Sequence, residues 1–179
     1  EINTSKANRA RINGNPTRSQ REILGAIQIV YFSPEDLDLV RGEPGNRRDF
    51  LDRLLITRTP RLAGVIADYE RVVKQRNALL KTRSSAAALV PWNEQLIKLG
   101  AELTAERIAL IDMILLRLGV CELVYFDTIP TKVSINEYID LAKDYSTEQS
   151  GHFVNGILDN IHKELVGSGK IQKISHKAK

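Results

Sequence analysis

Residues 110–125 read Leu110-Ile111-Asp112-Met113-Ile114-Leu115-Leu116-Arg117-Leu118-Gly119-Val120-Cys121-Glu122-Leu123-Val124-Tyr125. An apolar stripe recurs in this stretch at the three- and four-residue spacing of an α-helix face, at Leu110, Ile114, Leu118, Cys121 and Tyr125. The same spacing begins upstream, at Leu96, Leu99 and Leu103. The sequence therefore predicts one helix from Trp92 to about Phe126, without a break between Ala101 and Cys121.

A second helix is predicted just upstream, over Arg61 to Lys81. Its apolar residues follow a coiled-coil-like spacing, at Leu62, Ile66, Tyr69, Val73 and Leu80. The small residues from Ser84 to Val90 are expected to form a linker, and Pro91 suits the first turn of the following helix. Together the two segments predict an antiparallel helical hairpin.

The N-terminal part reads as a remnant of strands followed by helix. Asn8 to Ile12 alternates like a strand, and Asn13-Gly14-Asn15-Pro16 has the chemistry of a hairpin turn. Ser19 to Ala26 is expected to form one short helix. A further strand is predicted over Ile27 to Phe32, and helix is expected beyond Pro34.

Two more helices are predicted after Asp127-Thr128-Ile129-Pro130. Ser134 with Glu137, and Ser146 with Gln149, fit the capping box at their N-termini. The last helix is expected to bury Phe153, Val154, Ile157, Leu158, Ile161 and Leu165, and to end at Gly167-Ser168-Gly169. Lys170 to Lys179 is expected to be a disordered basic tail. The predicted fold class is thus mainly α, with an N-terminal strand remnant.

Charge changes along the chain. Glu1 to Ile111 holds 14 Arg and 4 Lys against 13 acids, whereas Asp112 to Lys179 holds 1 Arg and 7 Lys against 9 acids. A switch from Arg to Lys indicates two origins, joined between Glu102 and Met113. The chain is 42% hydrophobic and 27% charged, which is ordinary for a globular protein.

A single cysteine, Cys121, predicts a packed thiol in a reducing compartment. No apolar stretch approaches the roughly 20 residues of a membrane-spanning helix, and no leader segment is evident. We therefore expect a cytoplasmic protein that does not bind a membrane.

No catalytic constellation stands out. His152, His162 and His176 have no cysteine or carboxylate partner at metal-ligand spacing. Gly42-Glu43-Pro44-Gly45 and Gly167-Ser168-Gly169-Lys170 each lack part of a phosphate-binding loop. Acid pairs such as Asp49 and Asp52 suit a solvated helix face better than acid-base chemistry. We expect no enzyme activity, no metal and no cofactor.

Arginines form two clusters that suit phosphate groups, because guanidinium binds phosphate bidentately. The first contains Arg9, Arg11, Arg18 and Arg21. Nucleic-acid binding and a solvated charged surface are equally good interpretations of this cluster. The second surrounds a Gly-Pro turn and includes Arg47 and Arg48. For these two a structural role is favoured, through ion pairs with Glu43, Asp49 or Asp52.

The stretch Leu39-Val40-Arg41-Gly42-Glu43-Pro44-Gly45-Asn46-Arg47-Arg48-Asp49-Phe50-Leu51-Asp52 resembles the RecF family of recombination and repair ATPases. The resemblance extends over about residues 1–113, through Phe32-Ser33-Pro34-Glu35-Asp36-Leu37 and Pro91-Trp92. It corresponds to the middle of a RecF protein, with its helical lid. The family's phosphate loop, signature motif and magnesium-binding strand are not matched, so the resemblance implies lid contacts with DNA and not ATP hydrolysis.

The C-terminal part of the chain resembles a different family. Ile129-Pro130-Thr131-Lys132-Val133-Ser134-Ile135-Asn136-Glu137 and Phe153-Val154-Asn155-Gly156-Ile157-Leu158-Asp159 are similar to the second half of the NusB family. These transcription antitermination factors are helical and non-enzymatic, and they bind boxA RNA together with a ribosomal protein. The resemblance covers about residues 105–165. It implies RNA binding by Phe153 and partner contacts by Asp112 and Gln149, although core packing is the alternative for Phe153.

Four segments are therefore expected: a RecF-like remnant over 1–60, a RecF-like helical hairpin over 61–112, NusB-like helices over 113–166, and a basic tail over 167–179. Three functions remain open. They are RNA and ribosomal-protein binding in antitermination, a RecF-like DNA-repair fragment, and an engineered or artefactual chimera without selected function. Because each part lacks its family's usual packing surface, self-association is also expected.

Overall fold

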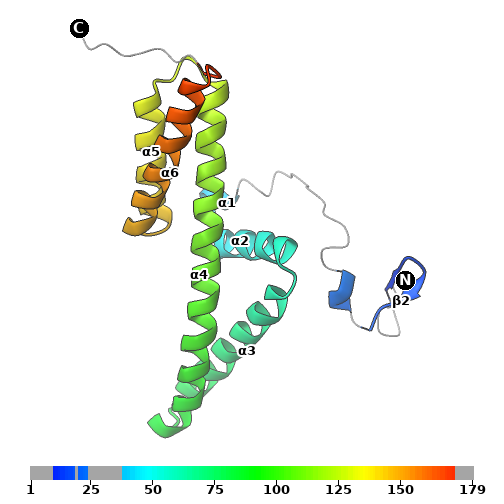
Figure 1. The fold of residues 1–179 in the computed structure, drawn as a ribbon. Coiled ribbons are helices and arrows are strands. Elements are labelled where there is room, and N and C mark those ends of the chain that lie inside the picture. The colour runs from blue at the N-terminus through cyan, green and yellow to red at the C-terminus, as the bar shows by residue number, and fades with distance from the viewer. Residues whose placement is uncertain (1–9, 19, 24–37, 172–179) are drawn as a thin grey trace. The chain divides into compact units, whose positions relative to one another are not determined.

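The computed structural model describes residues 10–18, 20–23 and 38–171 of the 179-residue chain, and this part is mainly helical (Figure 1). Its N-terminal elements are β1 (Arg11–Ile12), β2 (Asn15–Pro16) and the 3-10 helix η1 (Gln20–Ile23). The helices that follow are α1 (Asp38–Arg41), α2 (Pro44–Arg58), α3 (Leu62–Lys81), α4 (Ala86–Tyr125), α5 (Thr131–Tyr145) and α6 (Glu148–Gly167).

The chain divides into two compact units. Unit 1 comprises Glu1–Arg107 and unit 2 comprises Ile108–Lys179, so α4 contributes to both. The boundary falls inside the interval from Glu102 to Met113, where the change in composition places the join.

The predicted hairpin turn is confirmed. β1 and β2 pair antiparallel, with Arg11 opposite Pro16 and Ile12 opposite Asn15. The two turn residues have positive φ, 51° at Asn13 and 83° at Gly14, as a type I′ turn requires. Of the helix expected over residues 19–26, the described part forms η1. The strand expected over residues 27–32 lies outside the described residues.

The long helix is confirmed as continuous across the join, but its beginning was predicted wrongly. α4 begins at Ala86, inside the segment expected to be a linker, and the connection to α3 is only residues 82–85. Three alanines favour helix here, and the side chain of Ser85 accepts a hydrogen bond from the backbone N–H of Ala88 at 3.4 Å. Pro91 therefore lies inside the helix, where it lacks one backbone donor.

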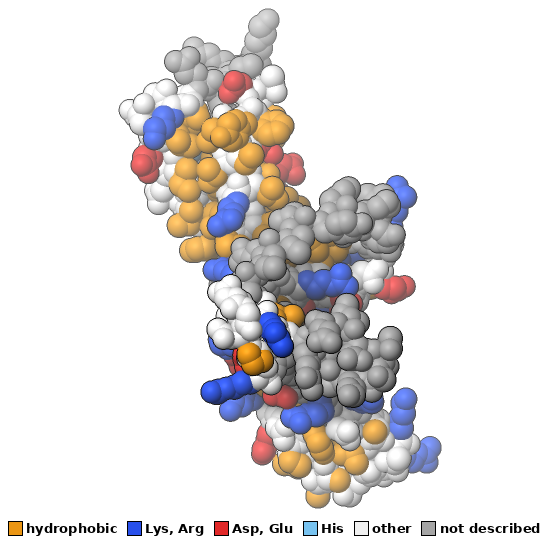
Figure 2. Space-filling model, turned by 90° about the vertical axis from the view of Figure 1, so that its right-hand side faces the viewer, with side chains coloured by type: hydrophobic (Ala, Val, Ile, Leu, Met, Phe, Trp, Pro, Cys, Tyr) orange, Lys and Arg blue, Asp and Glu red, His pale blue; other side chains and the backbone are white. Residues whose placement is uncertain are grey.

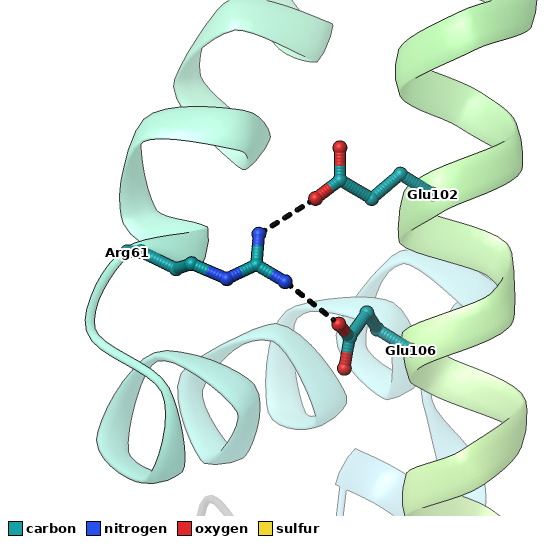
Figure 3. Close-up of polar contacts among 3 residues, drawn as sticks. All are labelled: Arg61, Glu102 and Glu106. Carbon is teal, nitrogen blue, oxygen red and sulfur yellow. Dashed lines mark hydrogen bonds and ion pairs between the residues drawn. The ribbon is translucent and has the colours of Figure 1, made fainter.

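The antiparallel hairpin of α3 and α4 is also present. Arg61, at the start of α3, bonds Glu102 at 2.7 Å and Glu106 at 3.1 Å (Figure 3). At the other end of α3, Nε of Arg76 donates to Oδ1 of Asn93 at 2.7 Å. The later residue of α3 contacts the earlier residue of α4, so the two helices are antiparallel. The hydrogen bond to Glu102 raises the pKa of Arg61, so this guanidinium stays charged.

The buried side of α3 differs by one position from the predicted one. Leu62, Ile66 and Val72 are buried, whereas Val73 is only partly buried and Leu80 is 45% exposed. The helix therefore turns a slightly different face inward than the expected spacing indicates.

The core of unit 2 joins the C-terminal half of α4 to α5 and α6. It consists of Leu115, Leu123, Ile135, Ala142, Val154 and Leu158. Burying each Leu, Ile or Val side chain of this core contributes about 1.5–3 kcal/mol. Gly119 allows α6 to approach α4 closely, because a Cβ there would lie 3.0 Å from both terminal methyl carbons of Leu158.

Both predicted capping boxes are wrong. α5 begins one turn early, after Pro130, whose carbonyl accepts from the N–H groups of Val133 and Ser134. Ser134 is thus an interior residue, 1% exposed, and its hydroxyl is one of the buried polar groups without a partner in the described part. The cap of α6 is Thr147 rather than Ser146, and its Oγ1 accepts from the N–H of Ser150 at 3.1 Å.

The end of the apolar stripe on α4 faces outward, contrary to expectation. Leu118 is 52% exposed, Tyr125 is 76% exposed, and the Cys121 thiol, expected to be packed, is exposed. Figure 2 shows hydrophobic side chains gathered on the visible face of unit 2. α5 and α6 pack against the opposite side of the helix, where Leu115 and Leu123 are buried.

Candidate nucleic-acid interface

α6 is amphipathic, and its two sides separate clearly. Val154 and Leu158 are fully buried in the core of unit 2. They are four residues apart and therefore lie on the same face of the helix. The opposite side, which we call the α6 outer face, consists of exposed residues at the same helical spacing: Gln149, Phe153, Gly156, Asn160 and Lys163.

Phe153 lies on this outer face and is 51% exposed. The prediction that the last helix buries Phe153 is therefore wrong. Core packing, the alternative to RNA binding for this residue, is wrong for the same reason. The helix turns by about 100° per residue, so burying Val154 places its neighbour Phe153 outside the core. An aromatic ring is thus accessible at the surface of α6.

Gly156 follows Phe153 by one turn, and nothing lies within 4 Å of the position that a Cβ would occupy. A glycine inside a helix costs roughly 0.5–1 kcal/mol relative to alanine. No packing contact explains this cost. The outer face therefore carries no side chain one turn beyond Phe153. Gly156 and Asn160 were not among the predicted site residues, although their spacing from Phe153 is visible in the sequence.

Asp112 lies beside the first turn of α6, but its carboxylate is engaged within unit 2. The hydroxyl of Ser150 donates to Oδ2 of Asp112 at 3.1 Å. The other oxygen, Oδ1, is buried without a partner in the described part of the chain. Ser150 is 4% exposed, so the bond helps to hold the start of α6 on α4. Gln149, next to it, is exposed.

The first arginine cluster is only partly described. Arg11 lies on β1 and Arg18 follows the hairpin, and both are exposed. Arg21 belongs to η1, and Arg9 lies outside the described residues. All four belong to unit 1, whereas Asp112, Gln149 and Phe153 belong to unit 2. Each group is therefore a candidate within its own unit.

Arg47 has a visible structural contact. Its Nη1 donates to the carbonyl oxygens of Gly42 at 3.3 Å and of Leu39 at 3.5 Å. Leu39 lies within α1 and Gly42 directly follows it, so Arg47 ties the start of α2 to α1. The contacts are made to carbonyl groups rather than to the acids named in the sequence analysis. Arg48 is exposed.

The described part of the chain offers neither a candidate metal centre nor a membrane-spanning helix. Residues 10–18, 20–23 and 38–171 contain no group of three or more His, Cys, Asp or Glu side chains arranged to hold a metal ion. None of the helices in this part of the chain is both long and apolar enough to span a bilayer.

Comparison with known proteins gives two results. The model of the NusB family matches residues 68–163, which run from within α3 to within α6. The match begins further toward the N-terminus than the resemblance found in the sequence. No solved structure matches the chain.

Curated relatives belong to a second group. The DNA replication and repair protein RecF of Kineococcus radiotolerans is 53% identical over 119 residues, covering 62% of this chain and 30% of the relative. The RecF protein of Streptomyces avermitilis is 50% identical over 121 residues, covering 62% of this chain and 32% of the relative. The chain thus spans about a third of the length of the curated relatives it matches.

These results support the composite character of the sequence. The NusB family match covers more than half of the chain and the RecF alignments cover 62% of it. The region matched by the NusB model and the region aligned with RecF must therefore overlap. Some residues between 68 and 163 are therefore similar to both families.

Proposed function

Because this chain belongs to the NusB family, we propose that it is a non-enzymatic protein that binds single-stranded RNA through the α6 outer face. The similarity to RecF proteins also supports a nucleic-acid-associated role. The observation that carries the proposal is the exposed side chain of Phe153, one helical turn before Gly156, which carries no side chain. Unstacked RNA bases stack on such rings, which duplexes do not permit.

The two units differ in net charge, and in this proposal they contribute differently to RNA binding. The first 111 residues carry a net charge of +5 and the remaining 68 carry −1, counting Arg and Lys against Asp and Glu. Unit 1, with Arg11 and Arg18 exposed, supplies attraction to phosphates that does not depend on sequence. The α6 outer face, which carries the exposed amides of Gln149 and Asn160 besides Phe153, supplies the preference for single-stranded bases.

We also propose a protein partner, the ribosomal protein of the antitermination complex, and a cytoplasmic location. Gln149 supports this contact better than Asp112 does. Its side chain is exposed, whereas the Asp112 carboxylate is bonded to Ser150. In this proposal Asp112 acts on the partner indirectly, by holding the first turn of α6 in place.

Titration of labelled RNA tests the proposal. Fluorescence anisotropy compares a boxA-like single strand, a scrambled strand and a DNA duplex, at low and at moderate salt. Replacing Phe153 with Ala should weaken binding to the single strands by about 5- to 150-fold, since one stacked base contributes about 1–3 kcal/mol. Binding to the duplex should not change.

Val166→Ala is the matched control. Val166 lies near the other end of α6 and is also 51% exposed, so its truncation removes a similar exposed contact from the same helix. Thermal unfolding of both variants shows whether the helix is intact. Equal losses in the two variants would mean that the α6 outer face is not the RNA site.

The second candidate is DNA binding by the RecF-like part, which the 50–53% identity of the relatives favours. It predicts tighter binding to the duplex than to either RNA, with no effect of Phe153→Ala. Absence of binding to all three nucleic acids at low salt would contradict both candidates and leave the chimera without selected function.

A further inference from the structure

The N-terminal half of α4 carries a second line of side chains that the hairpin with α3 does not cover. It consists of exposed residues, which we call the outer stripe: Ala87, Val90, Glu94, Ile97, Ala101 and Thr104. Val90 is 50% exposed and Ile97 is 71% exposed. The spacing alternates strictly between three and four residues, as in the contact seam of a coiled coil.

This regularity distinguishes the outer stripe from scattered apolar surface residues, which are common and need no partner. The residues that pack within unit 1, such as Leu103 and Gly100, lie on another side of the same helix. The stripe covers 18 residues of α4, which is about 26 Å of helix at 1.5 Å per residue. A seam of this length suits another helix.

We propose that the outer stripe binds the outer stripe of a second copy of this chain, with the two α4 helices antiparallel. In this direction the stripe is complementary to itself in one register. Ala87 lies opposite Thr104 of the second copy, Val90 lies opposite Ala101, and Glu94 lies opposite Ile97. Each contact then occurs twice, as the two-fold symmetry of most homodimers requires.

The charges select this direction. Lys98 directly follows Ile97 in the sequence, so the antiparallel register brings Lys98 of one copy next to Glu94 of the other. Both residues are exposed in the single chain. A parallel pair would place the two Glu94 carboxylates together in the seam, where like charges repel.

Association should be weak and concentration-dependent, because the seam consists mostly of small side chains. Sedimentation velocity of the 179-residue chain, over roughly micromolar to millimolar concentrations, should show a monomer-dimer equilibrium. Ile97→Glu should raise the dissociation constant by at least about tenfold, since it places two carboxylates in each central layer. A chain that stays monomeric throughout this range would contradict the proposal.

Leu118→Glu is the matched control. Leu118 is a large exposed apolar residue of α4 in unit 2, and the same substitution there should leave the dissociation constant unchanged. The reverse outcome, in which only Leu118→Glu abolishes dimers, would assign self-association to unit 2 and overturn the proposal. Circular dichroism verifies the helix content of both variants, and since both side chains are exposed, neither should unfold the chain.

Charge-changed variants test the register. Glu94→Lys and Lys98→Glu should each weaken self-association, because each places like charges side by side. An equimolar mixture of the two variants should form dimers again, since one then carries only positive and the other only negative groups at the contact. A mixture that associates no better than its components would rule out the Glu94–Lys98 contact between copies.

Disulfide trapping tests the direction. In a Cys121→Ser background, a Glu94→Cys variant mixed with an Ile97→Cys variant should form mixed disulfide dimers under mild oxidation. Each variant alone should cross-link poorly, because the antiparallel register separates identical positions. Efficient cross-linking of each variant with itself would indicate a parallel pair and contradict the proposal.

Discussion

Arg107 holds Asp52 through two hydrogen bonds, from Nε to Oδ1 at 2.8 Å and from Nη2 to Oδ2 at 2.7 Å. The pair joins α4 to α2 within unit 1, and its side chains are only 20% and 14% exposed. Such bidentate pairs are stronger than single ionic contacts, and removal of one partner leaves a partly buried charge unpaired.

A double-mutant cycle measures this pair. Asp52→Ala and Arg107→Ala should each lower the free energy of unfolding, with a coupling of about 1–3 kcal/mol between them. The exposed pair Asp68 and Arg71 is the control, because its side chains are 55% and 65% exposed. Its coupling should stay below about 0.5 kcal/mol. Equal couplings in the two cycles, measured by urea unfolding, would contradict the expected difference.

Gly119 and Gly156 should respond oppositely to the same substitution. Gly119→Ala places a methyl group 3.0 Å from Leu158, which is fully buried and has little room to move. The strain should exceed the gain in helix propensity and destabilise unit 2 by about 1–2 kcal/mol. Gly156→Ala meets nothing and should stabilise α6 by about 0.5–1 kcal/mol. Thermal unfolding compares the two, and stabilisation by both changes would mean that Leu158 yields easily.

Local signals explain which parts of the fold could be predicted. The turn at Asn13 and Gly14 follows from two adjacent residues that tolerate positive φ. The continuity of α4 through the join follows from apolar spacing, which packing reinforces on both sides of Arg107. In both cases the determining residues are close together in the sequence.

Features that depend on distant contacts could not be predicted. Phe153 and Val154 are neighbours of similar hydrophobicity, and the packing of α6 against α4 and α5 places Val154 in the core and Phe153 at the surface. The start of α5 is set locally instead: Pro130 precedes the helix, so Ser134 lies in its interior rather than at its cap. The contact between Asp52 and Arg107 spans 55 positions, so no local pattern reports it.

Tyr138 should make stability depend on pH in the alkaline range. Burial raises the pKa of its phenol to about 12, and the carboxylate of Glu122, which accepts from the hydroxyl at 3.3 Å, adds to the effect. An unfolded tyrosine has a pKa of about 10. Between these values the unfolded chain releases the proton while the folded chain keeps it, so stability falls as pH rises.

Tyr138→Phe removes this titration. Urea unfolding from about pH 9 to about pH 11 should therefore show a shallower loss of stability in the variant than in the unsubstituted chain. Tyr145→Phe is a suitable control, because Tyr145 is 62% exposed. If the Tyr138 variant loses stability as steeply as the control, the phenol does not carry the predicted linkage.

The salt dependence of nucleic-acid binding tests the arginines of unit 1. Each phosphate neutralised on a single strand contributes about 0.7 to the slope of log affinity against log salt, because counterions are released. Replacing Arg9, Arg11, Arg18 and Arg21 with Gln should reduce that slope by up to about 3. A control that replaces Arg41, Arg53, Arg71 and Arg83, all exposed in unit 1, removes the same charge from other surfaces. If the control flattens the slope equally, attraction arises from the net charge of unit 1 and not from a phosphate site near the hairpin.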